Sequence, residues 1–332
     1  MLVCDDGCGY ALRVTMDVPD DQAEHTRQTR EAYDRLAPVW SSATDEGPFN
    51  GLLERPALRA LVPGNLHGTA VLEAGCGSGA QAQWLLDQGA DVVAVDVSPQ
   101  MVKEAERRCA GRGRFLVADL AQPLPLAPGS LDGITCSLAL HYVADWSVPL
   151  RSFAAALRPG GWAVISLDHP CGPATARQRG GYFDTELVSD TWRKAGVEVT
   201  QHFWRRPLAA VFGAFADAGF TVDRVAEPQP TVEALRLFPD DLGPAATVPS
   251  FIVYRLWLQP YNHQGSERHP PRPAALLGQS SSPRRGSMPV GWGGRIGGSS
   301  DARSDGAPAA KGFPAQRAER AASGSVVGNG GR

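Results

Sequence analysis

Residues 71–80 read Val-Leu-Glu-Ala-Gly-Cys-Gly-Ser-Gly-Ala and lead directly into a helical stretch. The apolar run predicts a buried strand. The alternating glycines predict a sharp turn, because glycine has no Cβ to obstruct the turn or a ligand that approaches the backbone. The helix that follows presents unpaired N–H groups at its first turn. The stretch therefore predicts a cofactor-binding loop after a strand, formed by Glu73, Gly75, Cys76, Gly77 and Gly79.

The spacing of the glycines bears on which cofactor the loop binds. The dinucleotide fingerprint reads G-x-G-x-x-G and holds a pyrophosphate. Here an acid precedes three glycines at every second position, and the carboxylate of Glu73 would repel a diphosphate and attract an ammonium group. The loop resembles that of class I S-adenosylmethionine-dependent methyltransferases, in particular the small-molecule, type 11-like enzymes. The resemblance covers roughly residues 28–260 and implies S-adenosyl-L-methionine as cofactor and a small-molecule acceptor.

A second predicted strand, residues 90–96, ends in Asp96, which lies 23 positions after Glu73. An acid at this place can bind both ribose hydroxyls. Ser98 and Pro99 then supply an N-cap and a first-turn proline for the next helix. The resemblance adds Val97, Ser98 and Met101 to the cofactor site and implies that Met101 flanks the adenine.

Later strand ends complete the predicted cofactor site. A third strand, residues 113–118, precedes Asp119 and Leu120, where the resembled family uses an acid for the adenine amino group and a backbone N–H for a ring nitrogen. Ser137 falls at the end of the fourth strand. Residues 157–166 resemble the family's L-x-P-G-G segment, which ends a helix and turns into the fifth strand.

The order of the segments indicates the fold class. Predicted strands near 70–74, 91–96, 114–118, 132–137 and 161–167 alternate with helices near 79–88, 99–110 and 146–157. Such alternation predicts an α/β fold with a doubly wound, mostly parallel sheet. Residues 220–225 and 251–258 read as two strands without a long helix between them, so they can pair antiparallel. This matches the family's seven-stranded, Rossmann-like sheet with a reversed last strand, whose ligands bind beyond the carboxyl ends of the strands.

Two segments are candidates for binding the acceptor. Residues 32–40 read as a helix ahead of the first strand, and in the resembled family this region forms a lid, which makes Tyr33 and Trp40 candidate substrate-binding residues. Residues 168–206 are long, aromatic and without a clear period, and a segment of this kind inside a compact domain is often functional. His169 and His202 in this segment are further candidates, and the segment is interpreted as a substrate-covering insertion.

For catalysis the sequence favours His141, which follows the fourth strand together with Tyr142, a substrate-binding candidate. Imidazole can remove a proton from a hydroxyl or an amine near neutral pH. A packing role for each histidine is an equal alternative, because the sulfonium already activates the methyl group and positioning can supply much of the acceleration. The Leu-Ala-Leu-His-Tyr run departs from the N/D-P-P-Y pattern, which argues against methylation of exocyclic base or amide nitrogens. The acceptor atom, oxygen, nitrogen or carbon, stays open.

Composition divides the chain into a weakly patterned leader (1–25), the methyltransferase-like domain (26–260) and a Gly/Ser/Pro/Arg-rich tail (261–332). The tail cannot bury enough apolar surface to become ordered. It holds 10 Lys/Arg and 4 Asp/Glu, which leaves 22 and 31 for residues 1–260. The acidic body disfavours a nucleic-acid partner. Two alternatives stay open: a nicotinamide-dependent oxidoreductase, and a non-catalytic or RNA-associated module.

The remaining features are those of an ordinary enzyme, with 43% hydrophobic and 20% charged residues. No apolar run is long enough for a membrane helix, and no signal peptide is evident, so we expect a cytoplasmic protein with reduced cysteines. Cys4 and Cys8 have poor zinc spacing, and no metal is expected. The oligomeric state is not indicated.

Overall fold

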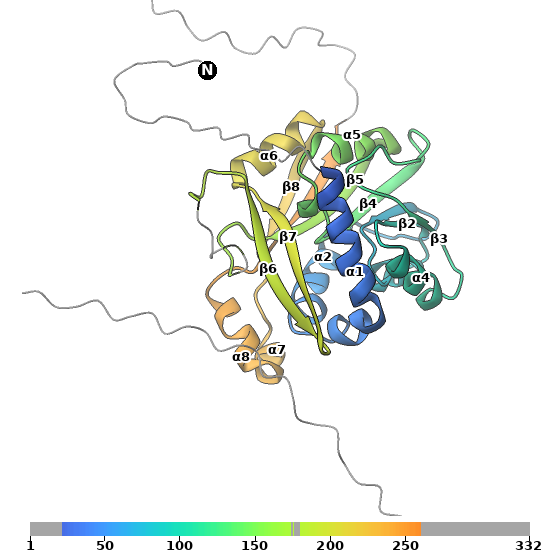
Figure 1. Ribbon diagram of the computed structural model, residues 1–332. Coiled ribbons are helices and arrows are strands. Elements are labelled where there is room, and N and C mark those ends of the chain that lie inside the picture. Colours follow the sequence, from blue (N-terminus) through green and yellow to red (C-terminus); the bar gives the residue numbers. More distant parts are fainter. Residues whose placement is uncertain (1–21, 174, 176–179, 260–332) are drawn as a thin grey trace, which may run out of the picture. The chain divides into compact units, whose positions relative to one another are not determined.

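The computed structural model describes residues 22–173, 175 and 180–259, and its centre is a seven-stranded sheet of order β3-β2-β1-β4-β5-β9-β8 (Figure 1). Strands β1 to β5 are parallel, whereas β9 runs antiparallel to both β5 and β8. The predicted doubly wound sheet with a reversed strand is therefore confirmed. The strands of this sheet are β1 (Ala70–Ala74), β2 (Asp91–Asp96), β3 (Arg114–Val117), β4 (Leu131–Ser137), β5 (Leu157–Asp168), β8 (Phe220–Ala226) and β9 (Phe251–Leu258).

Most helices lie between the strands, as the alternation predicts. The α-helices are α1 (Gln22–Thr44), α2 (Arg55–Leu61), α3 (Ala80–Asp87), α4 (Pro99–Arg108), α5 (Ser147–Ala156), α6 (Leu208–Asp217), α7 (Val232–Leu237) and α8 (Pro239–Leu242). Three short segments are the π-helix η1 (Asn50–Glu54) and the 3₁₀-helices η2 (Leu140–Tyr142) and η3 (Pro244–Ala246). Strand β5 begins at Leu157, four residues before the predicted start, because the strand continues through Gly160 at φ +77°. Within the described part of the chain, every helix is too short or too polar to cross a membrane.

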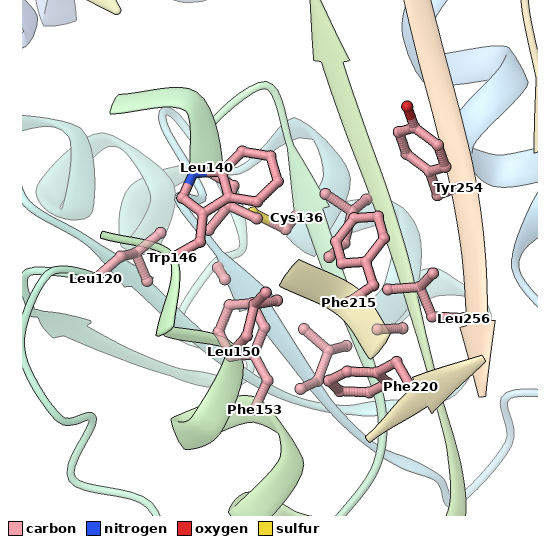
Figure 2. Packing of buried hydrophobic residues seen from close by; sticks show 14 of the residues in the cluster. Leu120, Cys136, Leu140, Trp146, Leu150, Phe153, Phe215, Phe220, Tyr254 and Leu256 are labelled. Atoms are coloured by element: carbon pink, nitrogen blue, oxygen red, sulfur yellow. The ribbon is translucent and has the colours of Figure 1, made fainter. Parts of the chain in front are cut away.

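Helices cover both faces of the sheet, because successive side chains of a strand point to opposite faces. Leu72 belongs to the core beneath α5 and α6, whereas Val71 belongs to the core beneath α2, α3 and α4. Figure 2 shows the first core, in which Phe215 of α6 packs against Tyr254 of β9 with ring centroids 5.3 Å apart. Trp146 stacks on Phe215 from the other side. These buried layers fix the carboxyl ends of β1, β2, β4 and β5 at one edge.

The segment predicted as irregular contains a regular hairpin. Strands β6 (Glu186–Lys194) and β7 (Val197–Arg205) pair antiparallel in a separate two-stranded sheet. Ala195 and Gly196 connect them, with φ angles of +46° and +83°. A two-residue turn with positive φ at both positions matches the twist of a hairpin, and glycine favours it. The sequence did not predict β6 and β7, because polar side chains on both faces interrupt the alternation of apolar and polar residues that is typical of a strand.

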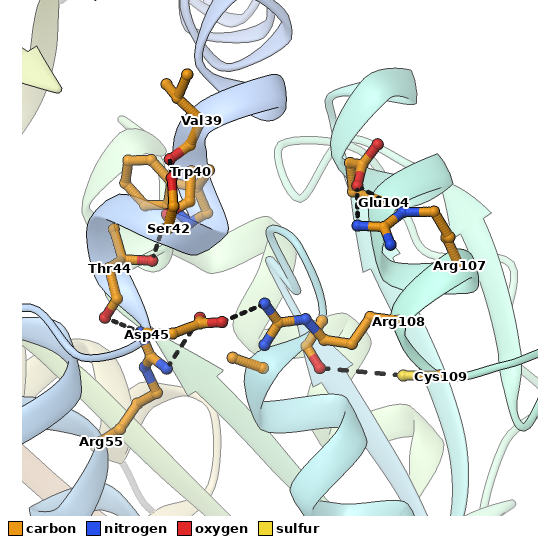
Figure 3. A network of polar contacts seen from close by, with 12 residues as sticks. Val39, Trp40, Ser42, Thr44, Asp45, Arg55, Glu104, Arg107, Arg108 and Cys109 are labelled. Carbon is orange, nitrogen blue, oxygen red and sulfur yellow. Dashed lines mark hydrogen bonds and ion pairs between the residues drawn. The ribbon is translucent and has the colours of Figure 1, made fainter. Parts of the chain in front are cut away.

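Helix α1 lies between the hairpin and α4 (Figure 1). Leu36 of α1 is buried in one cluster with Met101 of α4 and Val199 of β7. Asp45, directly after the helix, forms ion pairs with Arg55 of α2 and Arg108 of α4 (Figure 3). Arg55 also donates to the carbonyl of Thr44 at 2.6 Å. The carboxyl end of α1 is thus fixed to the domain.

Helix α1 begins inside the predicted leader of residues 1–25. The predicted tail and the two N-terminal cysteines, Cys4 and Cys8, lie outside the described residues, so the proposed division of the chain stays a prediction. The four cysteines of the described residues, Cys76, Cys109, Cys136 and Cys171, carry free thiols.

Candidate active site

The glycine loop turns directly after β1. Gly75, Gly77 and Gly79 have φ angles of +78°, +50° and +84°, which side chains with a Cβ rarely adopt. The N–H groups of Gly75 and Cys76 donate to the carbonyl of Val95 at 2.8 and 2.9 Å. The loop is therefore held against the end of β2, and its close turns explain the run of alternating glycines.

Asp96 fastens the loop to the start of α4. One carboxylate oxygen accepts from Gly77 N–H at 2.8 Å and the other from Ser98 N–H at 2.9 Å. Burial raises the pKa of Asp96 to about 6, against the opposing effect of these hydrogen bonds. Ser98 caps α4 by accepting from Met101 N–H at 3.0 Å, as predicted from the sequence. Val97, between Asp96 and Ser98, is partly buried.

Glu73 was expected to present a charged carboxylate at the strand end, but the structure buries it. Its side chain is only 1% exposed and accepts a hydrogen bond from Thr135, its register partner in β4. Burial raises the pKa of Glu73 well above its usual value. The carboxyl group faces the neighbouring strand, so the predicted electrostatic selection by Glu73 finds no support in this geometry.

Helix α1 covers the predicted cofactor residues. Asp34 accepts from the hydroxyl of Ser98 at 2.6 Å, and Thr26 donates to Asp119 at 3.2 Å. The indole of Trp40 lies over Gly77, where an added Cβ would be 3.5 Å from Nε1. Leu120, after Asp119, is buried in the core beneath α5 and α6. The structure thus brings the predicted cofactor residues from three strand ends together under one helix.

An aromatic cluster, formed by Tyr33, Trp40, Tyr142, Trp192 and Phe203, lies beside this loop. The hydroxyls of Tyr33 and Tyr142 are 2.9 Å apart, and Trp40 stacks on Trp192 with ring centroids at 6.1 Å. Phe203 of β7 packs near Tyr142. The predicted acceptor residues Tyr33, Trp40 and Tyr142 therefore meet, and the hairpin adds Trp192 and Phe203, which the sequence analysis did not single out.

His141 lies beside a carboxyl group that sequence reasoning missed. Its Nδ1 is 3.5 Å from Asp168 Oδ2, and its ring packs against Phe203. Burial lowers the pKa of His141 to about 3, with a smaller contribution from the charge of Arg206. Burial also raises the pKa of Asp168 to about 7, with the charges of Asp190 and Glu54 adding to the effect. Asp168 ends β5, and its place at a strand end is the signal that could have identified it.

Glu54 of η1 is a second missed residue. It is fully buried and accepts hydrogen bonds from Ser137, at 2.9 Å, and from Ser166. Burial raises the pKa of Glu54, and its Oε2 has no hydrogen-bond partner among the described residues. Ser137 was predicted as a cofactor residue, but its hydroxyl is engaged by this carboxyl group. Only the tertiary structure brings η1 to the ends of β4 and β5.

The other two candidate histidines, His169 and His202, have hydrogen-bond partners of their own. His169 is buried, with Nε2 2.9 Å from Glu227 and Nδ1 accepting from Cys171 N–H at 3.1 Å. His202 contacts Ser189 across the hairpin, with Nδ1 2.8 Å from the hydroxyl. Both ring nitrogens of His169 are thus engaged in holding the segment after β5. Their predicted substrate-binding roles gain no support from this arrangement.

The raised pKa of Asp168 predicts how stability depends on pH. The folded state binds this proton more tightly than the unfolded state, whose aspartate titrates near 4. The group therefore contributes stability below about pH 4 that is lost as pH rises to about 7. Relative to wild type, Asp168→Asn should gain on the order of 4 kcal/mol in unfolding free energy over this range, since one pKa unit corresponds to about 1.4 kcal/mol. Urea unfolding at several pH values measures the difference. Exposed Asp240→Asn is the control, and a pH-independent difference for Asp168→Asn would contradict the shift.

The comparisons with known proteins agree with this geometry. Residues 72–165 match the family described as a methyltransferase domain. A ubiquinone biosynthesis O-methyltransferase of Xanthomonas campestris is 28% identical over 159 residues, 45% of this chain and 65% of that protein. A magnesium-protoporphyrin O-methyltransferase of Rhodobacter capsulatus is 33% identical over 140 residues, 38% of this chain and 61% of that protein. The chain thus spans about half to two thirds of the length of the curated relatives it matches.

A solved structure of an S-adenosylmethionine-dependent methyltransferase from Mesorhizobium loti is 28% identical, with a TM-score of 0.50. The match covers 61% of this chain and 97% of that one. Neither an oxidoreductase nor a non-catalytic module is favoured by these likenesses. Sheet order, glycine loop and sequence match agree, and together they support a class I S-adenosylmethionine-dependent methyltransferase, a class of enzymes whose cofactor is S-adenosyl-L-methionine.

Proposed function

We propose that this protein transfers a methyl group from S-adenosyl-L-methionine to an oxygen, nitrogen or carbon of a small-molecule acceptor. The observation that carries the proposal is the glycine loop, tied to Asp96 by the Gly77 N–H and adjacent to the aromatic cluster. The cofactor supplies a methyl group that its sulfonium has already activated. The work of the protein is then to bind and orient two ligands and to manage a proton.

The residues around the loop fit this cofactor. Asp96 uses one lone pair on each oxygen for a backbone N–H and keeps others for ribose hydroxyls. Trp40 lies beside Gly77 with Nε1 and Cδ1 of its indole nearest the loop, so an aromatic side chain borders the place proposed for the sulfonium. Asp119 accepts from Ala121 N–H and from Thr26, and it stands where the family binds adenine. We infer that Glu73, buried against Thr135, supports the loop without touching the ligand.

Asp168 is the better candidate for the proton acceptor. A general base works best when its pKa lies near the operating pH, and that of Asp168 is raised to about 7. His141, with a pKa lowered to about 3, is neutral and a weak base. We infer that Asp168 takes the acceptor's proton and that His141, 3.5 Å away, orients the carboxylate. The role predicted for His141 is thereby narrowed from removing the proton to orienting Asp168, and it stays a prediction.

Calorimetric titration of the full chain with S-adenosylhomocysteine tests the proposal. Binding of this ligand without binding of NADH, used as the control, would support a methyltransferase. Binding of NADH alone would support an oxidoreductase. Binding of neither ligand would overturn the proposed function and favour a non-catalytic domain.

Asp96→Ala should weaken S-adenosylhomocysteine binding by about 1–3 kcal/mol, because two backbone N–H groups lose their acceptor and the ribose loses its partner. Titration of the variant measures the change. Asp91→Ala is the matched control, since Asp91 begins the same strand and is exposed. An unchanged affinity for Asp96→Ala would show that the end of β2 does not bind the cofactor.

A further inference from the structure

A small cavity lies on the acceptor side of the site, next to the His141–Asp168 pair. Residues from η2, β5, β7, α6 and β9 line it, so it lies beyond β4 on the side away from the glycine loop. The cavity volume is about 20 Å³. A cavity needs roughly 10–15 Å³ to hold one water, so this one has room for a small polar group.

The polar lining of this cavity is unusual. Six of its residues carry a buried nitrogen or oxygen without a hydrogen-bond partner among the described residues, although buried polar groups are normally paired. Five of these atoms are hydrogen-bond donors by chemistry, and the sixth, a ring nitrogen, is a donor in one tautomer. They are Trp146 Nε1, Trp204 Nε1, Arg205 Nε, Arg206 Nη1, Tyr254 Oη and His141 Nδ1.

Arg206 adds a buried positive charge, which the negative charge of Asp145 offsets only in part. The residue is 8% exposed, and its guanidinium lies over the ring of Trp146, 4.5 Å from the centroid. One nitrogen, Nη2, donates to the carbonyls of Val143 and Ala144, but no carboxylate pairs with it among the described residues. Burial lowers the pKa of Arg206 to about 9. A buried cation without a counter-ion is costly, unless a ligand supplies the negative charge.

Tyr254 is an uncharged residue of the lining whose polar group is also unpaired among the described residues. Its hydroxyl has no hydrogen-bond partner in the part of the chain that the structure describes, and Figure 2 shows it directed away from Phe215 and Leu256. A phenylalanine here would pack equally well against Phe215, so the fold alone gives no reason for the oxygen. The hydroxyl therefore points to a ligand.

We propose that this cavity binds a carboxylate group of the acceptor, with Arg206 as the counter-ion and Tyr254 and Trp204 as hydrogen-bond donors. This inference rests on the proposed function, because it names the chemical class of the acceptor. A carboxylate accepts several hydrogen bonds and carries none to donate, which matches a lining of donors. The acceptor is thus a small carboxylic acid whose reacting atom lies near Asp168, which also lines the cavity.

Indole N–H resonances of the ¹⁵N-labelled full chain provide the test. Trp146→Phe and Trp204→Phe assign the two signals, and benzoate is the probe, with benzamide as its neutral isostere. We expect benzoate to shift the Trp204 signal saturably and benzamide to leave it in place. Tyr254→Phe should weaken benzoate binding about tenfold with an unchanged melting temperature, since it removes only an unpaired hydroxyl. Arg206→Gln should weaken it about a hundredfold, and exposed Arg236→Gln should have no effect.

Several results would overturn the inference. They are equal shifts with benzamide, no shift with benzoate, or an unchanged benzoate affinity in Tyr254→Phe. Shifts with inorganic phosphate in place of benzoate would also overturn the assignment to a carboxylate. Because Arg206 also holds the segment after η2, Tyr254→Phe decides the matter if Arg206→Gln fails to fold. Titration with S-adenosylhomocysteine separates the two proposals. Binding of S-adenosylhomocysteine without benzoate removes only this inference. Binding of benzoate without S-adenosylhomocysteine removes the proposed function, and with it the assignment of the bound carboxylate to a methyl acceptor.

Discussion

Gly75→Ala is expected to lower the unfolding free energy by about 3 kcal/mol, through left-handed backbone strain and overpacking. Gly75 has a φ of +78°, and a Cβ built on it would lie 2.2 Å from the Cβ of Ala139. Real Cβ atoms do not approach so closely, so the glycine loop must move away from the end of β4. Binding of S-adenosylhomocysteine should be lost with the loop geometry. Urea unfolding and calorimetric titration measure the two effects.

Gly160→Ala separates the effect of backbone strain from the effect of steric overlap with a neighbouring side chain. Its φ of +77° equals that of Gly75 within a degree, but no atom lies within 4 Å of an added Cβ. This variant should therefore lose only about 1 kcal/mol, the cost of the left-handed conformation, and should bind the ligand normally. Equal destabilisation of both variants would show that contact between the loop and Ala139 is unimportant.

Asp168→Asn is expected to reduce kcat by about 100- to 10,000-fold, the usual contribution of a general base. The amide keeps the size of the side chain but cannot take a proton. In the wild type, kcat should rise with pH through about 7, because Asp168 must be ionised, and this rise should vanish in the variant. Transfer of a labelled methyl group to an acceptor found by screening carboxylic acids measures the rate.

The control for this experiment is Asp240→Asn, which changes an exposed carboxylate of α8 and should leave kcat unchanged. Affinity for S-adenosylhomocysteine should be the same in both variants, since Asp168 lies beyond the cofactor residues. A loss below about threefold in Asp168→Asn would mean that positioning alone carries the reaction. The pH profile of kcat for His141→Asn is a second test, because loss of an orienting residue should lower kcat without removing its dependence on pH.

Local pattern was sufficient to predict the backbone geometry of the strand–turn–helix junctions where the cofactor residues are proposed. The glycine loop, Asp96 and the Ser98 cap occupy consecutive strand–turn–helix junctions, where backbone conformation is set by neighbours in the chain. Glycine spacing, an N-cap and apolar runs encode such junctions directly. The mostly parallel sheet followed from the same alternation, and the antiparallel β8–β9 pair followed from the absence of a long helix between these strands, where the structure has only the short helices α7, α8 and η3.

The acceptor side could not be predicted in the same way. The β6–β7 hairpin was missed because its strands carry polar groups on both faces, so only pairing and the Ala195–Gly196 turn identify it. Asp168 and Glu54 were missed because neither belongs to a motif. Glu73 was assigned to the ligand from its place in a motif, but its side chain turns toward Thr135 of the adjacent strand.

The sequence by itself determined the fold class and the resemblance to a methyltransferase family, because these depend on short-range patterns of glycine, acid and apolar residues. The tertiary structure alone decided the surroundings of His141 and Asp168. Burial at the ends of β4 and β5 moves the pKa values of His141 and Asp168 in opposite directions, and the donors around Arg206 have no hydrogen-bond partner among the described residues. Desolvation depends on everything that surrounds a group, and those neighbours come from segments far apart in the chain.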